Sequence, residues 1–335
     1  MKTAFVTGTA GFVGFHLARR LLAKGWNVHG YDALTDYYDV SLKKDRHQLL
    51  SVSPKFSCTI GRLEDMVCLA EAAKQTAPDV IIHLAAQAGV RHSLEAPRTY
   101  IDANLTGTFN VLELAKAHRV DHLLMASTSS VYGSNRQMPF QETSLTDTPL
   151  SLYAATKKAN EMMAHAYAHN WGIPITMFRF FTVYGPWGRP DLALFKFVRA
   201  ALAGEAIDVF NYGKMARDFT YVDDLVKAID LLIGHTPTKA ETPPFRVVNI
   251  GNGDKVPLER FITATEKALG LPIKRNLRPM QMGDVPETWA DTDLLETITG
   301  FRPNTPIEDG IREFVDWYCR YYGVPADPSQ RPMVA

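Results

Sequence analysis

A tyrosine and a lysine four residues apart, Tyr153 and Lys157, could together carry acid–base chemistry. On a helix, positions i and i+4 lie on one face. The pKa of a free phenol is about 10, so tyrosine is a poor base at neutral pH, but neighbouring positive charge stabilises the phenolate. The hydroxyl of Thr128, at the end of an apolar run, could bind the same substrate oxygen and complete a proton relay at an alcohol. Because Tyr-x-x-x-Lys also occurs by chance on many helices, its meaning depends on the surrounding fold.

The N-terminus has the pattern of a strand, a glycine-rich turn and a helix. Gly8 permits a tight turn out of the strand, Gly11 lets the backbone approach a pyrophosphate, and Gly14 lets the helix pack closely. The first N–H groups of such a helix face the phosphates with the positive end of the helix dipole. A glycine triplet alone is also typical of a surface turn, so the residue that ends the next strand matters.

A second apolar run, residues 26–31, ends in Asp32. A carboxylate at this position can accept hydrogen bonds from both ribose hydroxyls of a dinucleotide, and it repels a 2′-phosphate. The sequence therefore favours NAD over NADP. Three basic residues of the next helix-like stretch, Lys43, Lys44 and Arg46, could reach the adenosine side of the cofactor or form a solvated helix face.

The order of the segments predicts an α/β fold with a doubly wound parallel sheet, because apolar runs alternate with helix-like stretches up to Phe180. The run at 79–84 is almost entirely apolar, as in a strand buried on both faces. Strands are expected at 3–7, 26–31, 56–60, 79–84, 122–126 and 173–180, and helices at 41–50, 63–75, 96–117 and 151–170.

The pattern changes after Thr182, where a turn-rich loop precedes helix-like segments at 192–203, 258–269 and 307–322. We expect a smaller, mostly helical C-terminal substrate domain at about 182–214 and 251–322. The NAD-binding domain would span 1–181 and about 215–250, with a helix at 222–233 and a strand at 245–250 returning to the main sheet. Residues 323–335 are Pro-rich and polar, as in a frayed tail.

Composition excludes several classes of function. The formal net charge is zero, so no bulk attraction to nucleic acid or to an anionic membrane is expected. The three cysteines, Cys58, Cys68 and Cys319, are widely spaced, and they indicate neither a disulfide framework nor a zinc or other metal site. The first apolar run is too short for a signal peptide, and nothing approaches a transmembrane length, so a cytoplasmic protein is expected.

Taken together, these motifs make the chain resemble the extended short-chain dehydrogenase/reductase superfamily. Within it, the chain is most similar to the UDP-glucuronate 4-epimerases, over nearly its whole length. The resemblance rests on the glycine turn with Asp32, on Thr128, Tyr153 and Lys157, and on the segments 83–86, 184–191, 217–224 and 282–285. It implies a Rossmann fold, bound NAD, a UDP-sugar substrate and a homodimer joined through helices near 104–118 and 153–170.

The resemblance also implies site residues. Thr128, Tyr153 and Lys157 would be catalytic. Arg217 would hold the nucleotide diphosphate, Asp284 would meet the uridine ribose, and Phe210 is a candidate to flank uracil. The cofactor-binding residues would be Gly8, Ala10, Gly11, Phe12, Val13, Gly14, Asp32, Leu84, Ala85, Ala86, Asn104, Tyr153, Lys157 and Phe180.

The residues that follow Thr128 indicate which reaction follows oxidation at the sugar C4. Related dehydratases and decarboxylases carry an acid there, but Ser129 and Ser130 cannot act as carboxyl acids or bases. Reduction at C4 with inversion should therefore follow. Oxidised glucuronate is a β-keto acid, which loses CO2 when the breaking C–C bond aligns with the carbonyl π system.

The site must therefore hold the carboxylate away from that alignment. Ser129, Ser130 and Thr182 are small hydroxyl donors, Arg189 can provide a bidentate clamp, and Arg91 is a second candidate. Arg189 could instead be a surface or diphosphate-binding arginine.

Three other functions stay open: a UDP-glucose/UDP-galactose 4-epimerase, a decarboxylase or dehydratase, and a non-enzymatic NAD-binding regulator. One departure from the family pattern is Arg62, where an aspartate usually contacts the adenine amino group. An arginine cannot accept that hydrogen bond, although it can stack on the ring. His83 is expected to be a buried strand-end residue satisfied by backbone groups.

Overall fold

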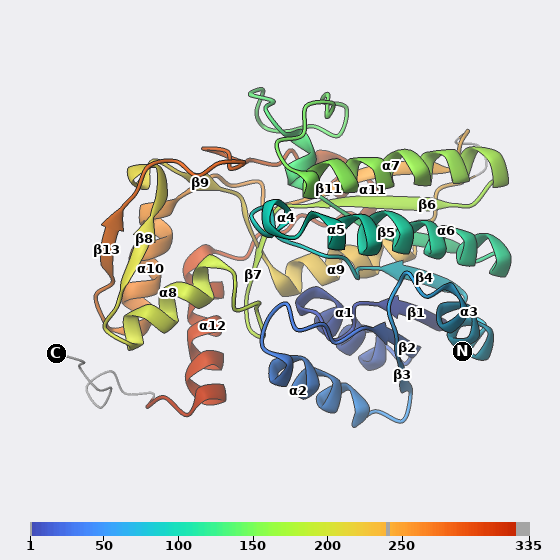
Figure 1. The fold of residues 1–335 in the computed structure, drawn as a ribbon, viewed down its shortest axis with the longest axis horizontal. Coiled ribbons are helices and arrows are strands. Elements are labelled where there is room, and N and C mark those ends of the chain that lie inside the picture. Colours follow the sequence, from blue (N-terminus) through green and yellow to red (C-terminus); the bar gives the residue numbers. More distant parts are fainter. Residues whose placement is uncertain (1, 239–241, 326–335) are drawn as a thin grey trace.

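A parallel sheet of seven strands forms the larger part of the structure (Figure 1). The computed structural model describes residues 2–238 and 242–325. The strands run in the order β3-β2-β1-β4-β5-β6-β11, and every neighbouring pair is parallel. The first strand, β1, therefore lies inside the sheet, and later strands lie on both sides of it, which confirms the predicted doubly wound arrangement. The strands are β1 (Thr3–Thr7), β2 (Asn27–Asp32), β3 (Phe56–Ile60), β4 (Val80–His83), β5 (His122–Thr128), β6 (Ile175–Phe180) and β11 (Phe245–Ile250).

Helices cover both faces of this sheet, because its central strands are apolar on both sides. Every residue of β4 and β5 is buried. Two hydrophobic clusters result, one under α1 and α9 and one under α3, α6 and α7. Side chains cap the starts of three of these helices, since Asp39 accepts from the Ser41 N–H, Asp65 from the Cys68 N–H and Ser151 from the Ala154 N–H. The helices of this layer are α1 (Phe12–Ala23), α2 (Val40–Ser51), α3 (Met66–Thr76), α6 (Gly107–His118), α7 (Leu152–Trp171) and α9 (Val222–Ile233).

The segment predicted as one helix at 96–117 is not uniform. It contains α5 (Pro97–Tyr100), a π-helical turn over Ile101–Thr106, and then α6, and it is preceded by the short α4 (His92–Glu95). The wider turn lies where Asn104 is buried and its amide group hydrogen-bonds outside the helix. Such turns often occur at functional sites, and this one lies behind the wall of the cavity described below.

A second lobe contains α8 (Ala193–Leu202), α10 (Leu258–Leu269) and α12 (Ile307–Tyr322), at the left of Figure 1. It also contains short strands that the sequence did not predict. The residues of β13 are all exposed and show no apolar alternation that could have revealed a strand. The short strand pairs are β8 (Ala206–Val209) with β13 (Lys274–Leu277), β9 (Ala216–Arg217) with β12 (Val256–Pro257), and β7 (Thr182–Tyr184) with β10 (Phe219–Tyr221). The short helix α11 (Asp293–Thr299) packs instead against α9 and β11 of the main sheet.

The chain passes between the two lobes more than once. After α8 and β8, α9 packs against the sheet beside α1, and β11 then pairs with β6. The predicted return of 222–233 and 245–250 to the sheet is therefore confirmed, while the domain bounds stay predictions. Of the expected tail, residues 326–335 lie outside the described residues. Within the described part of the chain, no helix is both long and apolar enough to cross a bilayer.

Candidate active site

A cavity of about 1510 Å³ lies at the carboxyl ends of the parallel strands and extends into the second lobe. Ligands bind at this edge in open α/β sheets. The cavity brings together every predicted site residue except Ala10 and Asn104. Those that line it are Gly8, Gly11, Phe12, Val13, Gly14, Asp32, Leu84, Ala85, Ala86, Arg91, Thr128, Ser129, Ser130, Tyr153, Lys157, Phe180, Thr182, Arg189, Phe210, Arg217 and Asp284.

The glycine turn leaves no room for side chains. Gly8 has φ +85°, and a Cβ on it would lie 2.8 Å from the Ala85 nitrogen. A Cβ on Gly14 would lie 2.0 Å from the Gly8 carbonyl oxygen, so α1 starts directly against the turn. The turn is held by hydrogen bonds from the Gly8 N–H to the Tyr31 carbonyl (2.8 Å) and from the Gly11 N–H to the Gly8 carbonyl (3.0 Å). This bare backbone cradle at a helix N-terminus suits the pyrophosphate of a dinucleotide.

Asp32 lies at the end of β2 with its carboxylate fixed by backbone groups. Oδ2 accepts from the Ala10 N–H and Oδ1 from the Leu34 N–H, both at 2.9 Å. Each oxygen keeps a lone pair for a ribose hydroxyl. Ala10 is fully buried and does not line the cavity, and it reaches the cavity wall through the N–H that it donates to Asp32; its contact with the cofactor stays a prediction.

Asn104, the other predicted cofactor residue outside the lining, lies behind the cavity. It is fully buried beneath the wall of the cavity rather than in its lining. Its Oδ1 accepts from the Gln87 N–H at 2.8 Å, and its Nδ2 donates to the Gln87 carbonyl at 3.0 Å and to Thr156 Oγ1 at 3.1 Å. Asn104 therefore holds the loop after β4 against α7, and its sequence position gave no sign of that partner.

Thr128, Tyr153 and Lys157 meet at the carboxyl end of β5. The Thr128 hydroxyl lies close enough to Tyr153 to influence the pKa of the phenol, and the Lys157 ammonium donates to the Ala126 carbonyl at 3.1 Å. Burial raises the pKa of Tyr153, while the Thr128 hydroxyl lowers it; the net direction is upward. Burial lowers the pKa of Lys157 to about 8. In the protein alone, burial thus outweighs the charge effect expected to favour the phenolate.

The residues after Thr128 form a wall of hydroxyl groups. The Ser130 N–H donates to Thr128 Oγ1 at 3.2 Å, and the Thr128 hydroxyl donates to Ser130 Oγ at 3.3 Å. Ser129 and Ser130 lie in a 3₁₀ turn, and Thr182 of β7 lines the same cavity. These hydroxyl groups can bind a carboxylate without themselves acting as acids.

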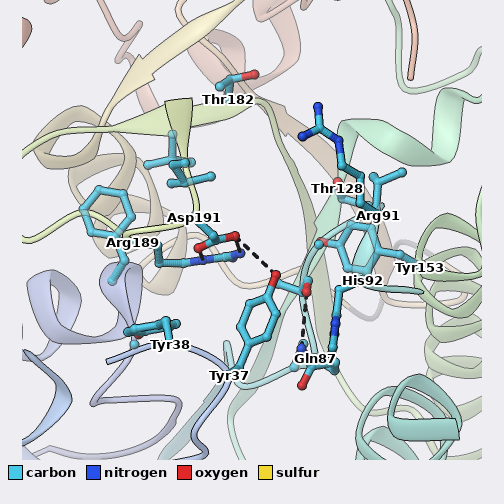
Figure 2. A pocket seen from close by; sticks show the side chains of 18 of the residues that line it. Tyr37, Tyr38, Gln87, Arg91, His92, Thr128, Tyr153, Thr182, Arg189 and Asp191 are labelled. Atoms are coloured by element: carbon cyan, nitrogen blue, oxygen red, sulfur yellow. Dashed lines mark hydrogen bonds and ion pairs between the residues drawn. The ribbon is translucent and has the colours of Figure 1, made fainter. Parts of the chain in front are cut away.

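Arg189 lies in the cavity but is already paired. Its Nε and Nη2 donate to the two carboxylate oxygens of Asp191 at 3.0 and 2.6 Å. Figure 2 shows this guanidinium facing the carboxylate, with the Tyr37 hydroxyl directed at the same group from 3.3 Å. Burial raises the pKa of Asp191, but the Arg189 charge lowers it, and the net direction is downward. The sequence did not identify Asp191 and Tyr37 as part of this cluster.

At the far end of the cavity, further cationic groups gather. The Arg91 guanidinium lies 5.0 Å from the centre of the Phe210 ring. Arg217 donates to Asp284 Oδ1 at 2.7 Å and to the Val285 carbonyl at 2.6 Å, so these two predicted substrate residues contact one another. Lys196 and Arg199 of α8 also line the cavity and were missed, although their spacing of three residues on an amphipathic helix was visible.

Two other residues singled out in the sequence, His83 and Arg62, also have defined contacts. His83 is buried between the hydroxyls of Thr7 (2.8 Å) and Thr108 (3.2 Å), and burial lowers its pKa to about 3. Side-chain hydroxyls rather than the expected backbone groups satisfy it. Arg62 lines the cavity and its Nε donates to Glu64 at 2.5 Å. In residues 2–238 and 242–325, no three or more His, Cys, Asp or Glu side chains are grouped as a metal site.

Arg46 corrects an expectation about α2. The sequence allowed two roles for the basic residues of α2, a contact with adenosine or a solvated helix face. Arg46 has neither role, because it is fully buried. Its guanidinium donates to backbone carbonyls of two separate loops.

Comparisons with known proteins agree with this geometry. Residues 4–251 match the model of the NAD dependent epimerase/dehydratase family. The chain is 53% identical over 331 residues to a probable UDP-glucuronate 4-epimerase of Rhizobium meliloti, covering 95% of this chain and 97% of that one.

Solved structures show the same architecture. UDP-glucuronic acid 4-epimerase from Bacillus cereus, in complex with UDP-glucuronic acid and NAD, superposes with a TM-score of 0.88 at 31% identity, covering 96% of this chain and all of that one. UDP-glucose 4-epimerase from Thermotoga maritima, with UDP-glucose, has a TM-score of 0.84 at 26% identity, covering 96% and 99% of the two chains.

Proposed function

The chain belongs to the NAD dependent epimerase/dehydratase family, and from that premise we propose that it interconverts UDP-glucuronate and UDP-galacturonate by inverting the sugar C4. The observation that carries the proposal is that Thr128, Tyr153 and Lys157 line one cavity and that the residues after Thr128 supply serine hydroxyls and not a carboxylic acid. The similarity to UDP-glucuronate 4-epimerases supports the choice of sugar.

In the proposed reaction, Tyr153 takes the proton of the C4 hydroxyl while Thr128 orients the same oxygen. When bound, NAD supplies the acceptor for the C4 hydride and later its donor. Lys157, buried and cationic below a pH of about 8, would stabilise the Tyr153 phenolate and bind the nicotinamide ribose. Inversion requires the 4-keto sugar to turn over and receive the hydride on its other face, with Tyr153 returning the proton.

We assign the cofactor to the glycine turn, Asp32 and the 84–86 strand end, and the substrate to the opposite end of the cavity. Ser129, Ser130, Thr182 and Arg189 would hold the carboxylate out of line with the C4 carbonyl π system. Arg217 would bind the diphosphate, with Phe210 and Asp284 around the uridine, and Arg91 stays the second candidate for the sugar carboxylate. Lys196 and Arg199 add positive charge on that side.

The test is incubation of the purified protein with UDP-glucuronate without added NAD. The expected result is UDP-galacturonate as the only new sugar nucleotide, without CO2 or free NADH. Turnover without added cofactor would also show that NAD stays bound. Release of CO2 as the main product would replace the proposal with a decarboxylase.

A second candidate is 4-epimerisation of UDP-glucose and UDP-galactose. One observation favours it: the Arg189 Nε and Nη2 groups, which would bind the carboxylate of a uronate, already donate to Asp191. The same assay with UDP-glucose decides between them, because the first candidate requires a much higher kcat/KM for the uronate.

We also propose a homodimer in the cytoplasm. Phe109 of α6 and Met162 and Trp171 of α7 are about half exposed, at 47%, 59% and 52%. Such apolar side chains on adjacent helices suit burial against a second copy. Cys58 and Cys68 are free thiols, which suits a reducing compartment. Sedimentation of the wild type and of a Met162→Glu variant would test the interface.

A further inference from the structure

One buried arginine connects the glycine turn to the loop that carries Arg189. Arg46 Nη1 donates to the Ala10 carbonyl at 2.7 Å and to the Tyr38 hydroxyl at 2.8 Å. Its Nη2 donates to the Trp187 carbonyl at 2.6 Å and to the Gly188 carbonyl at 3.3 Å. A single rigid guanidinium thus spans from the turn that would cradle the pyrophosphate to the two residues directly before Arg189.

The same loop has a second attachment to the cofactor side. His16 of α1 donates through Nε2 to the Pro186 carbonyl at 2.8 Å. Trp187 has φ +59°, an unfavourable backbone conformation for a bulky residue. The centre of its indole ring lies 5.4 Å from that of the Phe15 ring and 5.3 Å from that of the Trp317 ring. A non-glycine residue keeps such a conformation only when its surroundings enforce it. Residues 186–188 are therefore held in one arrangement, largely from α1 and α2.

The surroundings of Arg46 are not those expected of a side chain whose only role is to stabilise the fold. Its charge is buried among neutral oxygens, and in the part of the chain that the structure describes no carboxylate lies within ion-pair distance of it. Its Nε is buried without a hydrogen-bond partner among the described residues. A buried cation without a counter-ion is costly, so an apolar side chain would serve packing better.

We propose that Arg46 is a positioning residue that couples occupation of the glycine turn to the placement of Arg189 and Asp191. The proposal rests on the proposed function, in which these two residues border the sugar carboxylate. A pyrophosphate that fixes the turn around Ala10 would, through this guanidinium, also fix Trp187 and Gly188. Cofactor binding would thus further tighten an arginine loop that is already in position, before any β-keto acid can form.

The test compares Arg46→Met and Arg46→Lys with Lys44→Met, a matched control at an exposed position of the same helix. Hydrogen–deuterium exchange of residues 186–192 is measured with and without NAD. We expect NAD to slow exchange of this loop in the wild type and in Lys44→Met. In Arg46→Met the loop protection should be lost, while NAD still protects residues 8–14.

Kinetics give the second measurement. With UDP-glucuronate, kcat of Arg46→Met should fall by about 10- to 100-fold, because a small displacement of a positioning loop costs this much. KM should change little, and the fraction of turnovers that end in CO2 should rise. Arg46→Lys should show a smaller loss of the same kind, because one nitrogen replaces two that donate in different directions.

Wild-type kcat, product ratio and loop protection in Arg46→Met would overturn the proposal. If Arg46→Met does not fold, the same wild-type values in Arg46→Lys would overturn it. If the wild type does not convert UDP-glucuronate at all, the proposed function fails, but the exchange measurement still decides whether Arg46 couples the two loops.

Discussion

The two ends of the cavity satisfy their polar groups in different ways. At the cofactor end, the groups that would meet the ligand are fixed by the backbone: Asp32 by two N–H groups, and Gly8 by the Tyr31 carbonyl. At the sugar end, charged side chains satisfy one another, as in Arg189 with Asp191 and Arg217 with Asp284. The cofactor end is therefore complete without a ligand, whereas the sugar end must exchange partners when an anion arrives.

This difference separates affinity from selectivity. A preformed backbone cradle loses little entropy on binding, which favours a tightly held cofactor. A paired arginine binds an incoming carboxylate only by giving up, or sharing, its bond to the resident one. Such exchange weakens binding but discriminates strongly between sugars with and without a carboxylate.

The largest effect should come where the two ends meet, at Tyr153. Tyr153→Phe removes the proton carrier without changing the ring, and we expect kcat to fall by about 10²- to 10⁴-fold, the range for general acid–base catalysis. NAD binding, measured by calorimetry, should stay within a few-fold of wild type. Tyr167→Phe, elsewhere on α7, is the control. A Tyr153→Phe enzyme with more than a tenth of the wild-type rate would exclude the phenol from the relay.

Gly14→Ala tests whether the cofactor end is as rigid as it looks. The new Cβ would lie 2.0 Å from the Gly8 carbonyl oxygen, so the turn must shift. We expect a loss of about 3 kcal/mol in the free energy of unfolding, at the upper end for overpacking, and loss of NAD binding. Gly234→Ala is the control, because its nearest neighbour would be 3.5 Å away. Retained NAD affinity in a folded Gly14→Ala variant would show a deformable turn.

Lys157 makes the cofactor end sensitive to pH. Burial lowers its pKa from 10.5 to about 8. Below pH 8 the ammonium is protonated in both the folded and the unfolded chain, so the burial penalty is complete. Between pH 8 and 10.5 only the unfolded chain keeps the proton, and the free energy of unfolding should rise by about 3 kcal/mol relative to Lys157→Met. Urea unfolding of cofactor-stripped protein at pH 7 to 10 measures this; parallel pH curves for the two proteins would contradict it.

At the sugar end, Arg189→Ala should lower the preference for UDP-glucuronate over UDP-glucose. A charge-assisted hydrogen bond contributes about 1.5–3 kcal/mol, so we expect about a 10- to 100-fold change in the ratio of kcat/KM values. An unchanged ratio would end the role of Arg189 as a reader of the carboxylate.

Asp191→Asn sharpens this experiment. If Arg189 binds the substrate directly, freeing it from Asp191 should keep or raise the preference for the uronate. If the pair only holds the loop in place, Asp191→Asn should lower the preference as Arg189→Ala does.

The smallest effect is expected at the adenine side. Arg62 cannot accept a hydrogen bond from the adenine amino group, so Arg62→Asp should tighten NAD binding by roughly five- to tenfold, the value of one neutral hydrogen bond. Calorimetry with NAD measures it. Weaker binding of NAD to Arg62→Asp would instead favour stacking of the Arg62 guanidinium on the ring.

The features that the sequence predicted depend on local spacing. The glycine turn, Asp32, and the pair Tyr153 and Lys157 lie on single elements whose type follows from apolar periodicity. The contacts of Asn104 and Arg46 could not be predicted, because their partners Gln87 and Trp187 are distant in sequence and contribute only backbone atoms to these bonds. The exposed strand β13 was missed for a related reason, since its pairing with β8 rather than any pattern of its own makes it a strand.

The last strand of the sheet is added late. β11 pairs along its whole length with β6, but the chain first builds α8, β8 and other parts of the second lobe. During synthesis, β6 is therefore an open edge until residue 250 has emerged, and unpaired edges invite association with other chains. It also follows that a chain ended at residue 181 would not be a self-sufficient nucleotide-binding module, and that exchanging sugar lobes between relatives requires cuts at several points.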